Sequence, residues 1–151
     1  MKTIELINSS NLVIVDDEDF NNLNKYKWYL LNNGSVYGLI NKENTSMPSI
    51  ILDTKISVDH IDRNKLNNQK SNLRKASTSQ NLANRILFKN NKVGYKGVYY
   101  DRGKYKAQIC CAGKVKHLGR FENKEDAALA YNQAALIYFG EFANINQMEE
   151  K

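Results

Sequence analysis

The sequence predicts an α+β protein made of two small modules, and three observations support this fold class. A chain of 151 residues that is 42% hydrophobic can bury one modest core or two very small ones. Short β-prone stretches alternate along it with short helical patterns. Residues 89–94 have the Lys-, Asn- and Gly-rich composition of a linker, and the pattern changes beyond them. We therefore expect one module over residues 1–92 and another over residues 93–147.

The first stretch, residues 1–45, predicts a β-rich subdomain around one acidic helix. Residues 3–7 and 12–15 are apolar and β-prone, and Asp16 to Asp19 suit the N-terminus of a helix. Strand-like character resumes from Trp28 to Ile40, across an Asn-Asn-Gly turn. We find no cluster of catalytic residue types in this stretch.

Residues 46–88 predict the order strand, loop, strand, helix. The loop is too rich in Asn and Lys to be core, and a Ser or Thr side chain can cap the helix that follows. The expected elements are strands at 50–52 and 56–58, a loop at 62–71, a strand at 72–76, and a helix from Ser77 or Thr78 through Asn81 to about Arg85.

The C-terminal module predicts a three-stranded antiparallel sheet packed on one helix. Three short strands fit residues 95–118, with breaks at 101–103 and 112–113. Asn123 to Asp126 resembles a capping box, and the apolar residues beyond it recur at three- and four-residue steps.

Alternation along the middle strand predicts which side chains face outward. A period of two places Tyr105, Ala107 and Ile109 on the face that packs against the helix. The opposite face then carries cations, an amide and a thiol, from Lys104, Lys106, Gln108 and Cys110.

The charge of the chain favours a polyanionic partner. It carries 22 Lys and Arg against 16 Asp and Glu, a net charge of +6, and nine Tyr are interleaved with the basic residues. The excess concentrates in residues 54–93, which hold nine basic and two acidic residues. A solvated Lys face is the alternative explanation of this pattern.

The cysteine pattern and the hydropathy predict a cytoplasmic protein without a membrane partner. Cys110 and Cys111 are adjacent, so they offer neither a metal-knuckle spacing nor an ordinary disulfide framework. No apolar run approaches the roughly 18 residues that a membrane helix needs, and the N-terminus lacks a signal-peptide apolar region.

Three segments in the basic middle of the chain carry a recognisable motif. They read VDHID at 58–62, NNQKSNLR at 67–74 and SQNLANR at 79–85, with Asn72 twelve positions after His60 and Asn81 twenty-one after it. Together they resemble the HNH homing-endonuclease family. The resemblance implies a ββα-metal fold over residues 46–88.

The chemistry of phosphodiester hydrolysis explains these residue types. Neutral His60 can take a proton from water near neutral pH, which makes it the candidate general base. Asp59 and Asn81 supply hard oxygens, which suit one divalent ion, Mg²⁺ or Mn²⁺. By resemblance, Asn72 holds the His60 loop through backbone hydrogen bonds and supports catalysis without reacting.

One departure from the family pattern bears on activity. The preceding strand of the family commonly reads Met-His-Arg-Leu, whereas this chain has Met47-Pro48-Ser49-Ile50. An Arg beside the scissile phosphate would aid charge neutralisation. The alternative hypothesis is therefore a catalytically decayed DNA-binding or regulatory protein.

The C-terminal residues carry a second resemblance. YKGV at 95–98, GKYKA at 103–107, LGRF at 118–121, AALAYN at 127–132 and FGEFANIN at 139–146 look like the Apetala-type domain of ethylene-response factors. Similar domains occur behind HNH modules in phage and mobile-element nucleases. The resemblance implies DNA contacts from one sheet face, from Lys96, Tyr99, Arg102, Lys104, Lys106, Gln108, Lys114 and His117.

Together these features predict a metal-dependent homing-type HNH endonuclease that cuts or nicks duplex DNA at a preferred site. We expect a monomer in preference to a dimer, and no small-molecule cofactor. An RNA-directed nuclease is less favoured, because the sheet lacks the paired exposed aromatic residues of common RNA-binding modules.

Overall fold

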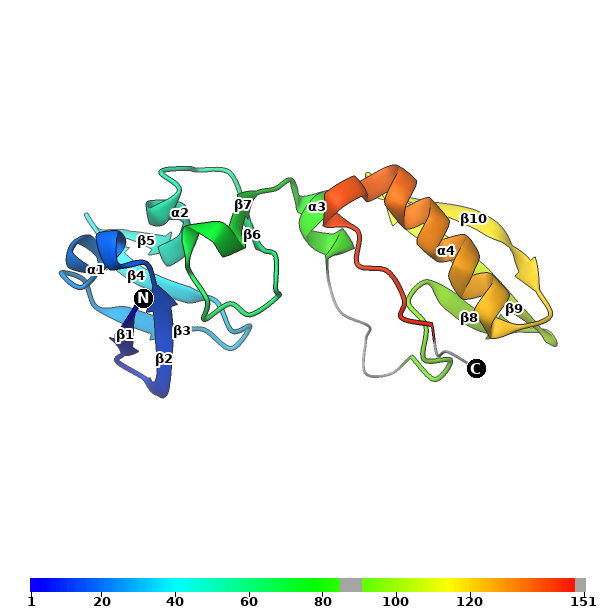
Figure 1. Ribbon diagram of the computed structural model, residues 1–151, viewed down its shortest axis with the longest axis horizontal. Helices are drawn as coiled ribbons and strands as arrows, with labels where there is room; N and C mark the ends of the chain where they lie inside the picture. The colour runs from blue at the N-terminus through cyan, green and yellow to red at the C-terminus, as the bar shows by residue number, and fades with distance from the viewer. Residues whose placement is uncertain (85–90, 149–151) are drawn as a thin grey trace. The chain divides into compact units, whose positions relative to one another are not determined.

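The computed structural model describes residues 1–84 and 91–148, and the chain divides into two compact units (Figure 1). The units are Met1–Ser77 and Thr78–Lys151, and both combine antiparallel strands with helices, as an α+β class requires. The division falls before the helix that the sequence analysis assigned to the first module, so this helix groups with the second unit. The expected helix end at Arg85 and the first linker residues 89 and 90 lie outside the described residues.

The first unit is built from three small antiparallel sheets and short helices. One sheet pairs β1 with β2, one has the order β3-β4-β5, and one pairs β6 with β7. The elements in chain order are β1 (Lys2–Leu6), β2 (Ser9–Val15), α1 (Asp17–Leu23), β3 (Trp28–Leu30), β4 (Val36–Ile40), β5 (Glu43–Ser46), α2 (Met47–Ile51), β6 (Val58–His60), the 3-10 turn η1 (Lys70–Asn72) and β7 (Leu73–Lys75).

Trp28 lies at the centre of the first core. It is fully buried, its indole Nε1 donates to the carbonyl of Leu23 at 2.9 Å, and it packs with Val13, Val15 and Met47. Gly38 lies directly opposite on β4, where a Cβ would come within 2.9 Å of a backbone oxygen and 3.1 Å of the indole. The backbone oxygen of Lys27, together with the indole, therefore requires a glycine at that position.

The expected strand at 50–52 is wrong, because the chain forms helix α2 there. Ser46 caps this helix, its hydroxyl accepting from the backbone N–H of Ser49 at 3.3 Å. Pro48 lies in the first turn, where the missing N–H costs no intrahelical hydrogen bond. The helix-capping contacts of Ser46 and Pro48 therefore outweigh the β propensity of Ile50 and Ile51.

The second unit packs one long helix on a three-stranded antiparallel sheet of order β10-β9-β8 (Figure 1). This confirms the arrangement expected from the strand and helix patterns. The elements are α3 (Thr78–Ala83), β8 (Val98–Asp101), β9 (Lys104–Cys111), β10 (Lys114–Phe121), α4 (Lys124–Phe139) and the 3-10 turn η2 (Gly140–Phe142).

Both hairpins of this sheet turn through two residues with positive φ. Arg102 and Gly103 have φ of 48° and 81°, and Ala112 and Gly113 have 51° and 75°. Two consecutive residues of this kind form the type I′ turn, whose twist matches that of the flanking strands. The breaks expected at 101–103 and 112–113 are therefore hairpin turns.

Small residues let α4 approach the sheet closely. Ala127, Ala128 and Ala135 are fully buried, and the first two pack with Val98 and Ala107. At Gly97 a Cβ would lie 2.0 Å from the Tyr131 ring, so only glycine fits there.

Candidate active site and nucleic-acid interface

Strands β6 and β7 carry the residues of the HNH motif. The antiparallel register pairs Asp59 with Arg74 and His60 with Leu73. Asp59 and His60 are neighbours on a strand, so their side chains leave it on opposite faces. The carboxylate and the imidazole therefore have separate sets of partners.

His60 is oriented by a buried amide. Its Nε2 lies 3.2 Å from Oδ1 of Asn68, which is fully buried. The Asn68 Nδ2 donates to the carbonyl of Lys65 at 3.0 Å, which fixes the amide with its oxygen toward the ring. Nε2 of a neutral imidazole therefore carries the hydrogen and Nδ1 is the basic nitrogen.

Burial lowers the pKa of His60 below its ordinary value of 6.5. Desolvation is the main cause, and it outweighs the Asn68 hydrogen bond and the nearby Asp62 and Asp59 carboxylates, which favour the charged form. The imidazole is consequently neutral at pH 7, as a general base must be.

Asn72 fixes the loop that follows His60. Its Oδ1 accepts from the backbone N–H of Asp62 at 2.9 Å, and its Nδ2 donates to Asp62 Oδ1 and to the Asn67 carbonyl, both at 2.8 Å. Its own carbonyl accepts from the N–H of Ile61 at 2.9 Å. Burial opposes ionisation of Asp62, but the hydrogen bonds from Asn67, Asn64 and Asn72 lower its pKa overall.

Asp16, which the sequence analysis placed at a helix N-terminus, also holds this loop from outside. It is the N-cap residue of α1, but its side chain makes no capping hydrogen bond. Instead its two oxygens accept from the Gln69 side chain at 3.0 Å and the Lys70 N–H at 2.8 Å. The hydrogen bond from the Lys70 backbone is the main reason that the Asp16 pKa is lowered.

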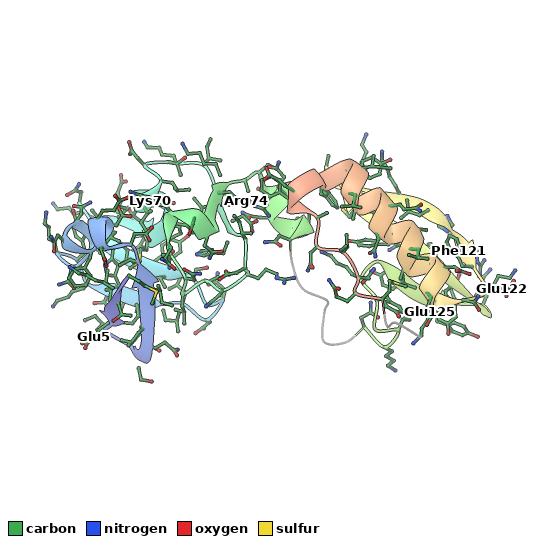
Figure 2. All side chains as sticks on the ribbon, viewed as in Figure 1. Glu5, Lys70, Arg74, Phe121, Glu122 and Glu125 are labelled. Carbon is green, nitrogen blue, oxygen red and sulfur yellow. The ribbon has the colours of Figure 1, made fainter. Side chains whose placement is uncertain are left out.

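The Asp59 carboxylate is held by Arg74, which Figure 2 labels. Nε and Nη2 of Arg74 donate to Asp59 Oδ2 at 3.0 and 2.8 Å. Both side chains are largely buried, with 14% of Arg74 and 8% of Asp59 exposed. This ion pair was not predicted, because it depends on the strand register.

The oxygen atoms of the two predicted metal ligands are of the kind that a hard divalent cation binds. Asp59 offers a carboxylate oxygen, and half-buried Asn81 offers an amide oxygen from α3, in the second unit. Over residues 1–84 and 91–148 no group of three or more His, Cys, Asp or Glu side chains could hold a metal ion. The structure thus brings Asp59, His60 and Asn72 together in the first unit, while Asn81 belongs to the other.

Pro48 and Ser49, which replace the usual family residues, serve helix α2. Pro48 is buried, and the Ser49 hydroxyl lies 2.5 Å from the Ser46 hydroxyl. These two positions therefore have a local structural role.

The outward face of the second unit's sheet carries two of the expected cationic side chains, Lys104 and Lys106. Ala107 and Ile109 are buried while Lys104 and Cys110 are exposed, which confirms the predicted alternation. Across the strands Gln108 lies opposite His117.

One row across this face includes a residue that the sequence analysis missed. Tyr99 on β8 and Arg120 on β10 both lie directly opposite Lys106 on β9. Arg120 is 40% exposed, and its Nη2 donates to the Asp101 carbonyl at 2.7 Å. A bulge between His117 and Gly119 shifts the register, so simple alternation along β10 could not place Arg120.

Other residues expected on this face lie elsewhere. Lys114 pairs with Cys111, which puts it on the same side of the sheet as Ile109, toward the helix. Lys96 donates its ammonium to the Ala83 carbonyl, and Arg102 lies in a hairpin turn. Lys104 does lie on the outward face, where it forms an exposed ion pair with Glu122 at 2.6 Å.

Comparison with known proteins gives the family. No family model matches the chain. A protein of Acanthamoeba polyphaga mimivirus, described as the uncharacterized HNH endonuclease L560, is 37% identical over an alignment of 134 residues that covers 84% of this chain and 70% of the viral protein. The chain belongs to the HNH endonuclease family. This finding confirms the HNH part of the resemblance. In the described part of this HNH endonuclease, no helix is long and apolar enough to cross a membrane.

Proposed function

We propose that this HNH endonuclease is a metal-dependent, homing-type enzyme that cuts or nicks duplex DNA at a preferred site. The observation that carries the proposal is the half-buried His60, whose Nε2 contacts Asn68 and whose pKa is lowered by partial burial. Its neighbour in the chain is the buried carboxylate Asp59. A neutral, oriented imidazole can act as the general base in phosphodiester hydrolysis, and a carboxylate is a suitable ligand for the metal ion that such a reaction uses.

In the proposed reaction, Nδ1 of His60 takes a proton from a water molecule. The water oxygen forms a bond to phosphorus, the bond from phosphorus to the 3′ oxygen breaks, and the leaving 3′ oxygen takes a proton from solvent. The products are a 5′ phosphate and a 3′ hydroxyl, and His60 returns its proton to solvent. Asn68 keeps the ring in the tautomer with a basic Nδ1, and Asn72 keeps the loop in place. A divalent ion, Mg²⁺ or Mn²⁺, held by Asp59 and Asn81, would neutralise charge on the phosphate.

We also propose an Apetala-type DNA-reading role for residues 93–147, with the nuclease function in residues 1–92. The support is a sheet face that presents Tyr99, Lys106 and Arg120 in one row, beside Gln108 and His117. Cations on such a face can contact phosphates, and an amide can read base edges. A monomer with one such nuclease site would nick one strand at a time.

The second candidate is a catalytically decayed DNA-binding protein. It is favoured by Pro48 and Ser49, whose contacts serve α2 where the family commonly has His and Arg. Metal-dependent cleavage separates the two candidates.

The test is cleavage of supercoiled plasmid and genomic DNA by the full chain with Mg²⁺ or Mn²⁺, followed by mapping of the nicked sites. We expect cleavage that a chelator abolishes and that His60→Ala reduces by about 10² to 10⁴, with DNA binding retained. The matched control is His117→Ala, since the chain has two His. It should weaken binding while leaving the rate on saturating protein unchanged. Absence of cleavage by the unmodified chain with either metal would favour the decayed protein.

A further inference from the structure

We propose that Arg74 is a displaceable counter-ion of Asp59. In the DNA-free protein Arg74 holds the carboxylate, and a DNA phosphate then takes over the guanidinium, so that the carboxylate becomes available to a divalent cation. Metal binding would consequently depend on DNA. This inference rests on the proposed function and concerns the regulation of that same site.

The geometry makes Arg74 a strong competitor for the carboxylate. The two residues lie directly opposite each other on β6 and β7, and two guanidinium nitrogens share one oxygen, Oδ2, at 3.0 and 2.8 Å. With side-chain exposures of 8% and 14%, the pair is shielded from water and screened little by salt.

Charge opposes the simultaneous presence of both cations at one carboxylate. Asp59 and Arg74 together are neutral, so a divalent ion that approached Asp59 would meet an already compensated carboxylate and the repulsion of a guanidinium. A site in this state attracts Mg²⁺ or Mn²⁺ weakly.

A phosphate diester can remove this obstacle. Guanidinium binds phosphate oxygens in the same two-point manner as it binds a carboxylate. Asp59 and Arg74 pair one step along the β6–β7 ladder from His60, on the other face, so a duplex whose scissile phosphate lies at His60 would offer a different, neighbouring phosphate to Arg74. The surrounding stretch, residues 54–93, holds nine basic and two acidic residues, which favours the approach of a polyanion.

Thermodynamic linkage gives the measurable form of the proposal. If DNA raises the affinity for the metal, the metal must raise the affinity for DNA by the same factor. We expect a factor on the order of 10, within the range usual for coupled sites.

The test measures Mn²⁺ binding by electron paramagnetic resonance on the full chain. The DNA arm uses a mixed-sequence duplex and a His60→Ala background, so that the DNA stays intact. Without DNA, Arg74→Gln should bind Mn²⁺ about tenfold more tightly than the unmodified chain, and duplex DNA should then add little. The matched control is Lys75→Gln, which removes the same charge from the next residue of β7, opposite Val58 and away from Asp59.

Arg74→Lys covers the case in which the Gln variant fails to fold. It keeps the charge and loses the two-point contact, so DNA-free Mn²⁺ affinity should stay low while the gain on adding DNA falls. Equal Mn²⁺ affinities of the His60→Ala chain with and without DNA would overturn the inference. The inference would also be overturned if Arg74→Gln and Lys75→Gln changed the DNA-free Mn²⁺ affinity equally. It would be overturned as well if DNA raised the Mn²⁺ affinity of Arg74→Lys as much as it raises that of the chain with Arg74.

Failure of the inference is distinguishable from failure of the proposed function. Metal-dependent cleavage together with Mn²⁺ affinity that ignores Arg74 overturns the counter-ion role and leaves the nuclease intact. Absence of both cleavage and Mn²⁺ binding, with or without DNA, overturns both.

Discussion

Oδ1 of Asn68 lies 3.2 Å from Nε2 of His60, and the amide is completely buried. This contact decides which ring nitrogen is basic. It also makes the protonation of His60 sensitive to a single substitution that leaves the shape of the site unchanged.

We expect the cleavage rate to persist below pH 6.5, the ordinary pKa of His, because burial lowers the pKa of His60 and the neutral ring is the active form. Asn68→Asp places a negative charge at Nε2, which favours the imidazolium and raises that pKa. The acid limb of the pH–rate profile should then move to higher pH. Asn64→Asp, a control in the same loop, should leave the profile in place. An unshifted profile in Asn68→Asp would contradict the orienting role.

Asp59→Ala should differ from His60→Ala in its response to metal. It removes a proposed ligand, so a higher Mg²⁺ or Mn²⁺ concentration should restore part of the rate, whereas no concentration should rescue His60→Ala. Rates measured over a metal titration test this contrast. Rescue of the His60 variant by metal would reverse the two assignments.

Asp16→Asn should destabilise the first unit by about 1 kcal/mol at neutral pH, because a charged acceptor of two hydrogen bonds is lost. The pKa of Asp16 is lowered from 3.8 in the folded chain. Its stabilisation is therefore present above about pH 4 and is lost as the pH falls through the lowered folded value. Urea unfolding at pH 7 and pH 3 should show the difference from the unmodified chain shrinking in acid. Asp17→Asn, which removes an exposed ion pair with the N-terminus, should cost much less.

Arg120→Ala and Lys106→Ala should each weaken duplex DNA binding and lower the salt slope by about one, because each would remove one phosphate contact. Titrations between about 50 and 200 mM salt measure this slope. Lys116→Ala is the control, since its ammonium lies 4.2 Å from the Tyr138 ring centre on the helix side of the sheet. A Lys116 effect equal to that of Arg120 would reject the outward face as the binding surface.

Gly97→Ala should destabilise the second unit by roughly 2 kcal/mol or more, through a clash with the Tyr131 ring and a φ of 74°. Gly103→Ala isolates the backbone penalty, because φ there is 81° and no atom lies within 4 Å of the added Cβ. Circular dichroism should report the loss. The fluorescence of Trp28, the chain's one tryptophan, should stay unchanged, because Trp28 lies in the first unit. Equal costs at both glycines would refute the close packing at Tyr131.

Sequence reasoning was sufficient where the pattern is local and repeated. Along β9 a period of two separates buried Ala107 and Ile109 from exposed Lys104, and the breaks expected at 101–103 and 112–113 are where the two hairpin turns lie. The prediction of a strand failed at α2. There the Ser46 cap and Pro48 in the first turn favour a helix, although the apolar residues also suit a strand.

The missing parts of the site depend on contacts that no spacing rule gives. The Asp59–Arg74 pair requires the register of two three-residue strands, and Arg120 requires the bulge in β10. The Asn68 contact requires a loop folded back on His60. The sequence shows an Asn eight residues after the motif His, at position 68. That this Asn is fully buried, which makes it an orienting partner, could not be inferred from one sequence.

The loop between β6 and β7, residues 61–72, is attached to β2 and to Asp16, so the motif residues alone do not make a folded site. Ile14 exchanges backbone hydrogen bonds with Leu66 and Asn68, both at 2.8 Å, and Asp16 holds Gln69 and Lys70. A product of internal translation initiation at Met47 would contain every residue from Asp59 to Asn81, yet it would lack all of these attachments. Shortened genes that retain the motif but have lost their first fifty codons should therefore encode inert proteins.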